Sequence, residues 1–307
     1  MSTPTRDDDR LALARPAPEA ASLERAAIEL PDGYVTPAHV WQGRSALATP
    51  CEPVVYLHGI QSHPGWFSGS ASAMAAAGWP VVMPTRRGSG ANTVARGDAP
   101  SPECLLDDLA ACCRWAARRF DAKRVHLAGV SWGGKLAAVF CARPRPGVEI
   151  GSLTMAAPGI VPQIDVPLKQ KLAIGMALLG RGGTGQERGT ALFDIPLNDP
   201  ALFTDNPAMR EYLECDAHRL HRATARFLFA SNRLDAMLRS RGAAIGVSTT
   251  LILARRDRII DNDKTRRVVG KVTAGRAKVV ELDVAHTMDF EPDPTEFYQA
   301  MLAALAD

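Results

Sequence analysis

Short apolar runs alternate with longer segments of helical periodicity along most of this 307-residue chain. Six short runs rich in apolar residues are predicted as strands, at 53–57, 79–83, 125–130, 152–156, 249–254 and 278–282. Between residues 102 and 120 the apolar side chains instead recur on one helical face, which is typical of an amphipathic helix. This alternation predicts an α/β fold, a mostly parallel sheet with helices on both faces.

Two extended segments between residues 22 and 41 precede the first buried run. They flank Pro31-Asp32-Gly33, in which Pro fixes φ and Gly accepts a positive φ, so a hairpin is predicted at the start of the sheet. With this hairpin the sheet has eight strands. Helices are predicted at 66–77, from Pro102 after its cap Ser101, at 135–140, at 264–272 and from Asp293-Pro294 onward.

The alternation stops at residue 158 and resumes at about residue 246. The segment between contains no buried strand run but three amphipathic stretches, at 168–179, 209–213 and 220–228, with a glycine-rich break at 181–185 after the first. We predict a helical cap over the carboxyl edge of the sheet, where ligands bind in open α/β sheets. The alternative is a second structural domain with no role in binding.

The predicted domain organisation follows from these boundaries. Residues 22–157 and 246–307 are predicted to form the α/β core, and residues 158–245 the cap. Residues 1–21 are rich in Pro, Ala, Asp and Arg without periodicity and are predicted to be a mobile tail.

Composition narrows the class of protein. The formal charge is only +3 and the arginines lie in scattered small groups, which favours solvated faces over a nucleic-acid footprint. The six cysteines form no C-x-x-C pair and no metal spacing with histidine, so a reducing compartment is favoured. Asp7-Asp8-Asp9 stands where a secretion signal needs positive charge, and no apolar run is long enough to span a membrane. We therefore expect a cytoplasmic protein without a membrane span.

The motif with the clearest chemistry is Gly129-x-Ser131-x-Gly133, which follows the apolar run 125–130 and precedes an alanine-rich helix. Strand, sharp turn and helix in this order are the context of a nucleophile elbow. Residues without a Cβ at positions 129 and 133 let strand and helix approach closely, and the strained turn lifts the hydroxyl off the sheet edge. Ser131 is therefore predicted to be a nucleophile, although the bare motif also occurs in ordinary strand–helix turns.

A serine hydroxyl needs a base, and the base needs an acid that fixes its tautomer. In this fold the chain order is Ser, acid, His. His286 lies just past an apolar strand, on the same sheet edge as Ser131, whereas His218 and His221 lie in the predicted cap, where surface or packing roles are expected. Asp257 follows the strand 249–254 by three residues and is the predicted acid. Its competitors are Asp261, which is better placed to cap a helix, Asp263 and Asp235.

The substrate carbonyl oxygen becomes charged during attack and needs preorganised donors. We predict the backbone N–H of Trp132, directly after the nucleophile, and that of Ile60, in the loop after the first buried strand. His58 is predicted to hold that loop, and Arg87-Gly88-Ser89-Gly90 to shape the pocket floor. The sequence contains no metal constellation and no phosphate loop after a strand, so neither metal nor cofactor is expected.

These residues carry a resemblance to the α/β-hydrolase superfamily, and within it the chain is similar to the monoacylglycerol lipase and lysophospholipase-like serine hydrolases. The matching pieces are Leu57-His58-Gly59-Ile60, 86–90, 129–134, Asp257-Arg258-Ile259 and 286–291. The chain departs from the family pattern at Thr85, where an Asp is common, and at Gln61-Ser62-His63, where monoacylglycerol lipases carry Gly-Glu-His. The resemblance implies Ser131 as nucleophile, His286 as general acid/base, Asp257 as orienting acid, and Ile60 and Trp132 as oxyanion donors.

The predicted function is hydrolysis of small carboxylic esters, such as acylglycerols or lysophospholipids, through an acyl-enzyme and without a cofactor. A peptidase or amidase is the second interpretation, because Ser131-Trp132-Gly133 is reminiscent of proline iminopeptidases, whose His-Gly-Gly-Pro-Gly is absent here. An acyltransferase would share the triad. Dehalogenases and epoxide hydrolases of this fold need Asp at the elbow, and a non-catalytic scaffold usually lacks a triad member.

Overall fold

The computed structural model describes residues 23–43, 51–180, 188–240 and 242–306. The predicted mobile tail and the glycine-rich break at 181–185 therefore lie outside the described residues. The strands of the main sheet are β1 (Leu23–Glu29), β2 (Val35–Trp41), β3 (Val54–Leu57), β4 (Val81–Pro84), β5 (Val125–Val130), β6 (Ile150–Ala156), β9 (Ser248–Ala254) and β10 (Lys278–Leu282). Their spatial order is β1-β2-β4-β3-β5-β6-β9-β10.

Strand β2 is antiparallel to both of its neighbours: it forms the predicted hairpin with β1 and also pairs with β4. The remaining neighbours are parallel. Within the buried strands, successive side chains enter opposite cores: Val55 and Leu57 of β3 face one cluster, Val54 and Tyr56 the other. The predicted α/β fold class, with an eight-stranded and mostly parallel sheet, is confirmed.

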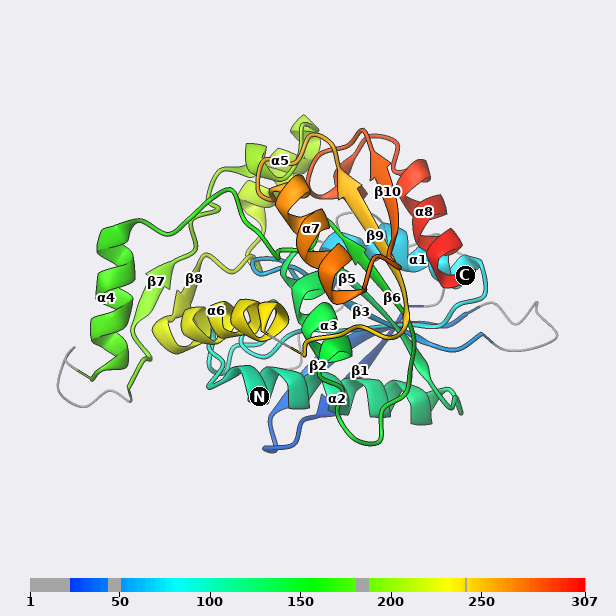
Figure 1. Cartoon of the computed structure of the whole chain (residues 1–307), viewed down its shortest axis with the longest axis horizontal. Helices are drawn as coiled ribbons and strands as arrows, with labels where there is room; N and C mark the ends of the chain where they lie inside the picture. Colours follow the sequence, from blue (N-terminus) through cyan, green and yellow to red (C-terminus); the bar gives the residue numbers. More distant parts are fainter. Residues whose placement is uncertain (1–22, 44–50, 181–187, 241, 307) are drawn as a thin grey trace.

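Helices cover both faces of this sheet (Figure 1). The helices of the α/β core are α1 (Ser68–Ala76), α2 (Pro102–Arg119), α3 (Trp132–Ala142), α7 (Asn262–Val272) and α8 (Thr295–Ala306). Apolar residues of α2, α3 and α7 pack into one cluster, and those of α1 and α8 into the other. The cap of α2 is the predicted one, since Ser101 Oγ accepts the Cys104 N–H at 3.0 Å.

A long insertion, called here the β6–β9 insertion (residues 157–247), separates β6 from β9. Its elements are α4 (Leu168–Leu178), β7 (Leu192–Asp194), α5 (Pro207–Cys215), β8 (Arg222–Thr224) and α6 (Ala225–Arg239). Figure 1 shows α4, β7 and β8 at one end of the molecule, beyond α6. The antiparallel pair of β7 and β8 was not predicted from the sequence.

The prediction of one continuous helical segment at 220–228 is wrong. Its first part is the strand β8, and helix α6 begins at Ala225. The reason is local: Thr224 Oγ1 accepts the Phe227 N–H at 3.1 Å and so caps the helix there, while its hydroxyl donates to Asp98 at 2.6 Å. Two other helices begin at different residues than predicted. Pro64–Phe67 forms a 3₁₀ turn, so α1 begins only after it, and α3 begins earlier than predicted, at Trp132.

Candidate active site

Ser131 occupies the turn between β5 and α3 with φ of 53° and ψ of −122°. A positive φ is strained for a residue with a Cβ, and such strain is held in place only by surrounding structure. The flanking glycines explain how the turn closes. A Cβ on Gly129 would lie 2.6 Å from the carbonyl carbon of Gly133, and a Cβ on Gly133 would lie 2.4 Å from the carbonyl oxygen of Leu57. The Gly-x-Ser-x-Gly pattern is therefore a steric requirement of this turn.

Backbone hydrogen bonds fix the serine from both sides. The Ser131 N–H donates to Ala156 O at 2.9 Å, and Ser131 O accepts the N–H groups of Lys135 and Gly159 at 3.2 and 2.7 Å. The sheet register places Leu57 opposite Gly129, so the loop after β3 lies beside the turn. A Cβ on Gly59 would be 3.5 Å from Ser131 Cβ. The predicted nucleophile and the predicted oxyanion loop are thus in direct contact.

His286 and Asp257 follow the neighbouring strands β10 and β9, whose last residues Leu282 and Ala254 are in register. The His286 Nδ1 lies 2.8 Å from Asp257 Oδ2, and both side chains are almost fully buried. The other oxygen, Oδ1, accepts the N–H groups of Ile259 and Ile260 at 2.8 and 2.9 Å. An acceptor at Nδ1 selects the tautomer with the proton on Nδ1, which leaves Nε2 as the basic nitrogen.

The Nε2 atom of His286 is buried and has no hydrogen-bond partner among the described residues. Ser131 and His286 line one narrow pocket of about 10 Å³, together with Gly59 and Phe203, but the hydrogen bond between them is not formed in this structure. Catalytic hydrogen bonds are often long before a substrate binds. The arrangement supplies an oriented base whose unpaired nitrogen lies in the same pocket as a strained serine.

A larger cavity of about 420 Å³ adjoins this pocket. Ile60, Ser131 and Leu197 line both, so the serine stands between the histidine and the cavity. The β6–β9 insertion supplies most of the other walls, which are largely apolar and include Ile164, Ile174, Ile195, Leu228 and Phe229. Cavities of this size and polarity are typical of small-molecule sites.

One polar group of side chains lies in the wall of this cavity. Lys135 Nζ is 3.2 Å from Asp235 and 3.1 Å from Ser231 Oγ, and the same hydroxyl accepts Trp132 Nε1–H at 2.9 Å. Burial lowers the pKa of Lys135 and raises that of Asp235, in each case against the attraction of the partner. Asp235 is therefore paired with a lysine on helix α3, and it is Asp257, not Asp235, that contacts His286.

Both ring nitrogens of His58 are engaged with backbone groups, so His58 is not placed to act as a base. Its Nδ1 is 2.9 Å from Gly59 O, and its Nε2 accepts the backbone N–H of Arg86 at 3.0 Å. Burial and the nearby Arg86 lower the pKa of His58 to about 3, so the ring is neutral. Its hydrogen bonds hold the loop, as the sequence predicts.

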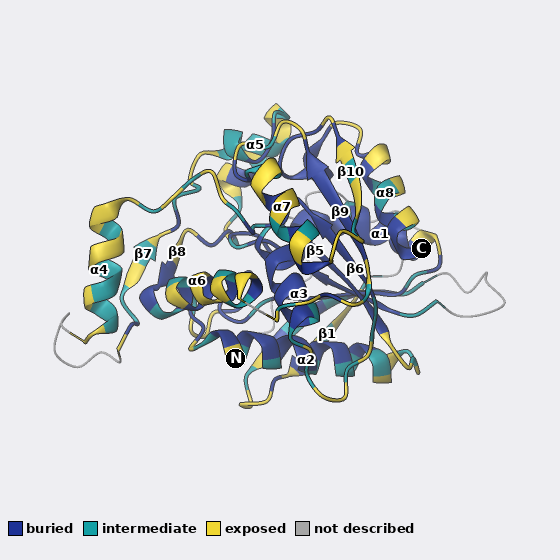
Figure 2. Cartoon of the chain, viewed as in Figure 1, coloured by how far each residue is buried: buried dark blue, intermediate teal, exposed yellow. Residues whose placement is uncertain are grey.

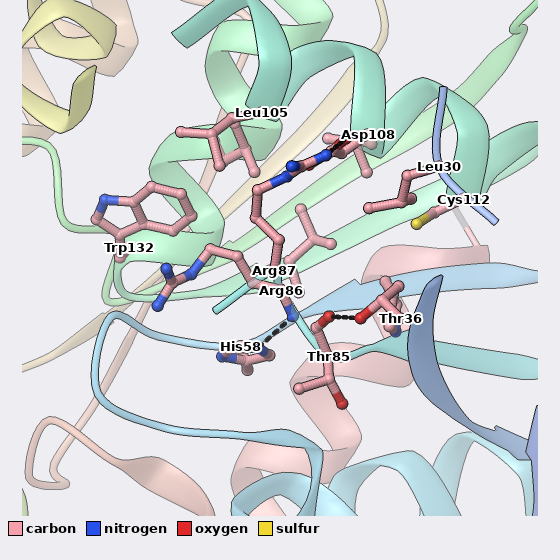
Figure 3. A pocket seen from close by; sticks show the side chains of 14 residues that line it. Leu30, Thr36, His58, Thr85, Arg86, Arg87, Leu105, Asp108, Cys112 and Trp132 are labelled. Atoms are coloured by element: carbon pink, nitrogen blue, oxygen red, sulfur yellow. Dashed lines mark hydrogen bonds and ion pairs between the residues drawn. The ribbon is translucent and has the colours of Figure 1, made fainter. Parts of the chain in front are cut away.

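The loop that contains Arg86-Arg87-Gly88 borders a separate, smaller cavity of about 40 Å³ (Figure 3). Arg87 there binds Asp108 through Nε at 2.5 Å and Nη2 at 2.7 Å, and binds Asp32 through Nη1 at 2.9 Å. Residues 87–90 are not among those that line the larger cavity. The glycine-rich loop therefore braces the sheet behind the site instead of forming the floor of the cavity with Ser131.

The sequence did not predict the contacts between the predicted oxyanion loop and the insertion. Arg219 donates to Gln61 Oε1 at 3.1 Å, and the Leu220 N–H donates to Gln61 O at 2.8 Å. His63 Nε2 lies 3.0 Å from Asp216 Oδ2. Partners more than 150 residues apart leave no local pattern; the only signal was the departure of Gln61-Ser62-His63 from the monoacylglycerol lipase motif.

No group of three or more His, Cys, Asp or Glu side chains among the described residues is arranged to hold a metal ion. Within the same ranges, no helix combines the length and the apolar character needed to cross a bilayer.

The sheet, the strained serine turn and the residues at the carboxyl ends of β5, β9 and β10 define an α/β-hydrolase. The particular family follows from a family model described as serine aminopeptidase, S33, which matches residues 48–293. The chain belongs to that family.

Solved structures give the same fold. The chain is similar to a soluble variant of monoglyceride lipase from Saccharomyces cerevisiae in complex with a substrate analogue, with a TM-score of 0.78 and 15% identity over 95% of this chain and 97% of that one. A monoacylglycerol lipase from Paleococcus ferrophilus matches with a TM-score of 0.69 and 18% identity over 92% and 98%. A thermophilic esterase from Thermogutta terrifontis matches with a TM-score of 0.62 and 17% identity over 92% and 98%.

Proposed function

We propose that the protein hydrolyses carboxylic esters of small molecules, with acylglycerols, lysophospholipids or similar acyl esters as the substrate class. The observation that carries the proposal is that the strained Ser131 and the buried His286, which Asp257 orients, line one pocket. Two of the similar structures are monoglyceride lipases and a third is an esterase, which supports ester substrates.

The reaction proceeds in two acyl transfers. Ser131 Oγ attacks the ester carbonyl carbon while its proton passes to His286 Nε2, and the carbonyl electron pair moves onto oxygen. The N–H groups of Ile60 and Trp132 bind that oxyanion. Collapse of the intermediate expels the alcohol, which takes the proton from His286. Water then attacks the acyl-enzyme with His286 as base, and the acid is released.

In this proposal residues 158–245 act as a cap over a core of 22–157 and 246–307, and the cavity of about 420 Å³ receives the acyl chain. Each buried methylene contributes about 0.8 kcal/mol, which corresponds to about a fourfold gain in kcat/KM if the contact is made in the transition state. We expect kcat/KM to rise from p-nitrophenyl acetate to esters of medium chain length. Phe229→Ala, which removes part of the wall, should flatten this rise and leave acetate turnover within about twofold.

The family description favours one second candidate, an aminopeptidase. Such an enzyme needs a carboxylate for the substrate ammonium group, and the two acids that line the cavity, Asp165 and Asp235, are already paired with Lys171 and Lys135. This pairing favours the esterase.

The test compares p-nitrophenyl esters of increasing chain length with the p-nitroanilides of alanine and proline, on wild type and Ser131→Ala. We expect turnover of esters by wild type alone. Turnover of the anilides without turnover of the esters would overturn the proposal in favour of the peptidase.

A further inference from the structure

Arg86 is a partly buried cation beside the predicted oxyanion loop, and the reaction above does not use it. Its Nε and Nη1 atoms are buried and have no hydrogen-bond partner, and no carboxylate among the described residues pairs with it. Its sequence neighbour Arg87 is paired with both Asp108 and Asp32. An unpaired buried charge costs stability, so its presence calls for a reason outside the folding of the chain.

The contacts of Arg86 converge on the two predicted oxyanion donors. Its Nη2 donates to Ile60 O at 2.7 Å, and its guanidinium carbon lies 4.9 Å from the centre of the Trp132 ring. The guanidinium carbon also lies 4.6 Å from the centre of the Phe227 ring, and the centres of the Phe227 and Trp132 rings are 5.6 Å apart. Figure 3 shows the Arg86 side chain turned toward Trp132, whereas that of Arg87 points to Asp108.

The main chain of Arg86 adds a third link. Its N–H donates to His58 Nε2, which leaves the His58 proton on Nδ1 to donate to Gly59 O. Gly59 O and the Ile60 N–H belong to one planar, trans peptide and point in opposite directions. Fixing the Gly59 carbonyl therefore aims the Ile60 N–H away from it, and the guanidinium fixes the next peptide through Ile60 O.

We propose that Arg86 is a positioning residue for the oxyanion site, which holds the Ile60 peptide and the Trp132 residue in the orientation that binds the developing oxyanion. The inference rests on the proposed acyl-transfer function. Burial lowers the pKa of Arg86 to about 9, which leaves the side chain charged at neutral pH. Arg86 lines the cavity of about 40 Å³ and neither the serine–histidine pocket nor the cavity of about 420 Å³, and from there its positive charge polarises the Ile60 carbonyl that it binds.

The decisive variants are Arg86→Met and Arg86→Lys, with Arg87→Lys as the matched control. Arg86→Met keeps the length and apolar contact of the side chain but removes the charge and the hydrogen bond to Ile60 O. With p-nitrophenyl butyrate we expect kcat to fall about 10- to 100-fold while KM changes less than about threefold. Arg86→Lys should recover a large part of kcat.

Two further readouts separate positioning from a structural role. Butane-1-boronic acid adds to the serine as a tetrahedral anion, so its inhibition constant should rise in Arg86→Met by about the factor lost in kcat. Because a buried charge is removed, the melting temperature should stay constant or rise. Arg87→Lys, which weakens a paired contact, should lower the melting temperature and leave kcat within about twofold.

The outcomes distinguish this inference from the proposed function. An active wild type with unchanged kcat and boronic acid affinity in folded Arg86→Met overturns the inference alone. An inactive wild type that also resists a fluorophosphonate probe overturns both. If Arg86→Met does not fold, Arg86→Gln, which keeps an N–H donor without charge, takes its place with an expected intermediate fall in kcat and the same criterion for rejection.

Discussion

Helices α3 and α4 both contribute to the wall of the larger cavity and differ in almost every physical respect. Every residue of α3 from Trp132 to Phe140 is buried, and the helix starts at the strained serine. Helix α4 has no buried residue, and it exposes Leu168, Leu172 and Met176 along one face. The contrast is visible in Figure 2, where the core around α3 is dark and α4 is mainly yellow and teal.

This difference separates two tasks. The proposed acyl transfer needs donors and bases held to a fraction of an ångström, and close packing around the strained serine provides that on the α3 side. Recognition of an apolar substrate needs surface area without fixed polar geometry, and the thinly packed insertion around the cavity provides that. Changes on the α3 side should therefore affect rate constants and folding, while changes in α4 should affect both only slightly.

The largest effect is expected at the predicted triad. His286→Ala and Asp257→Asn should each lower kcat about 10⁴-fold, the latter because an amide no longer holds the proton on Nδ1. Leu172→Ala in α4 should leave kcat within about twofold. Steady-state ester kinetics test this, with circular dichroism as the control for folding. A fall of less than about tenfold in either triad variant would contradict the assigned roles.

Two glycine substitutions test the same comparison through stability. Gly133→Ala places a Cβ within 2.6 Å of the carbonyl oxygens of Leu57 and His58, so we expect a loss of about 3 kcal/mol or more. Gly175→Ala in α4 meets no atom within 4 Å and removes backbone freedom from the unfolded chain, so a gain of about 0.5–1 kcal/mol is expected. Urea denaturation measures both. A similar change in the free energy of unfolding for the two substitutions would contradict the difference in packing between α3 and α4.

A last expected effect is a dependence of stability on pH. The pKa of buried His58 lies near 3, below that of an unfolded histidine near 6.5, so the unfolded chain binds the proton first. The contribution of the neutral His58 to the free energy of unfolding is fully present above pH 6.5. It falls by up to about 1.4 kcal/mol per pH unit as the pH drops toward 3. In urea denaturation between pH 7 and 5, His58→Gln should show a shallower slope than wild type. Exposed His221 in the insertion supplies the control, and an equal effect of His221→Gln would count against this account.

What the sequence predicted well is either local or enforced by the sheet. Gly129, Ser131 and Gly133 carry the elbow within five residues, because the close approach of strand and helix depends only on missing Cβ atoms. Asp257 and His286 are far from Ser131 in sequence, but Asp257 follows the buried strand β9 and His286 follows its neighbour, the edge strand β10. Parallel strands bring their carboxyl ends to one edge, so the approximate position of these side chains was predictable.

What the sequence did not predict depends on packing between distant segments. The pairing of β7 with β8 joins three-residue strands without a hydrophobic alternation long enough to detect. The bond from Arg86 to Ile60 and the bond from Arg219 to Gln61 join loops whose proximity follows only from the folded insertion and sheet. An arginine in a loop has the same sequence pattern whether it is solvated or packed against the peptide of a neighbouring loop.

The central claim is that Ser131 is a nucleophile activated by His286. Its most direct test is peptide mapping by mass spectrometry after reaction with a fluorophosphonate, which modifies only an activated serine. The account predicts a single adduct on the peptide that contains Ser131, and its disappearance in His286→Ala. An adduct on another residue, or no adduct on the folded wild-type protein, would contradict it.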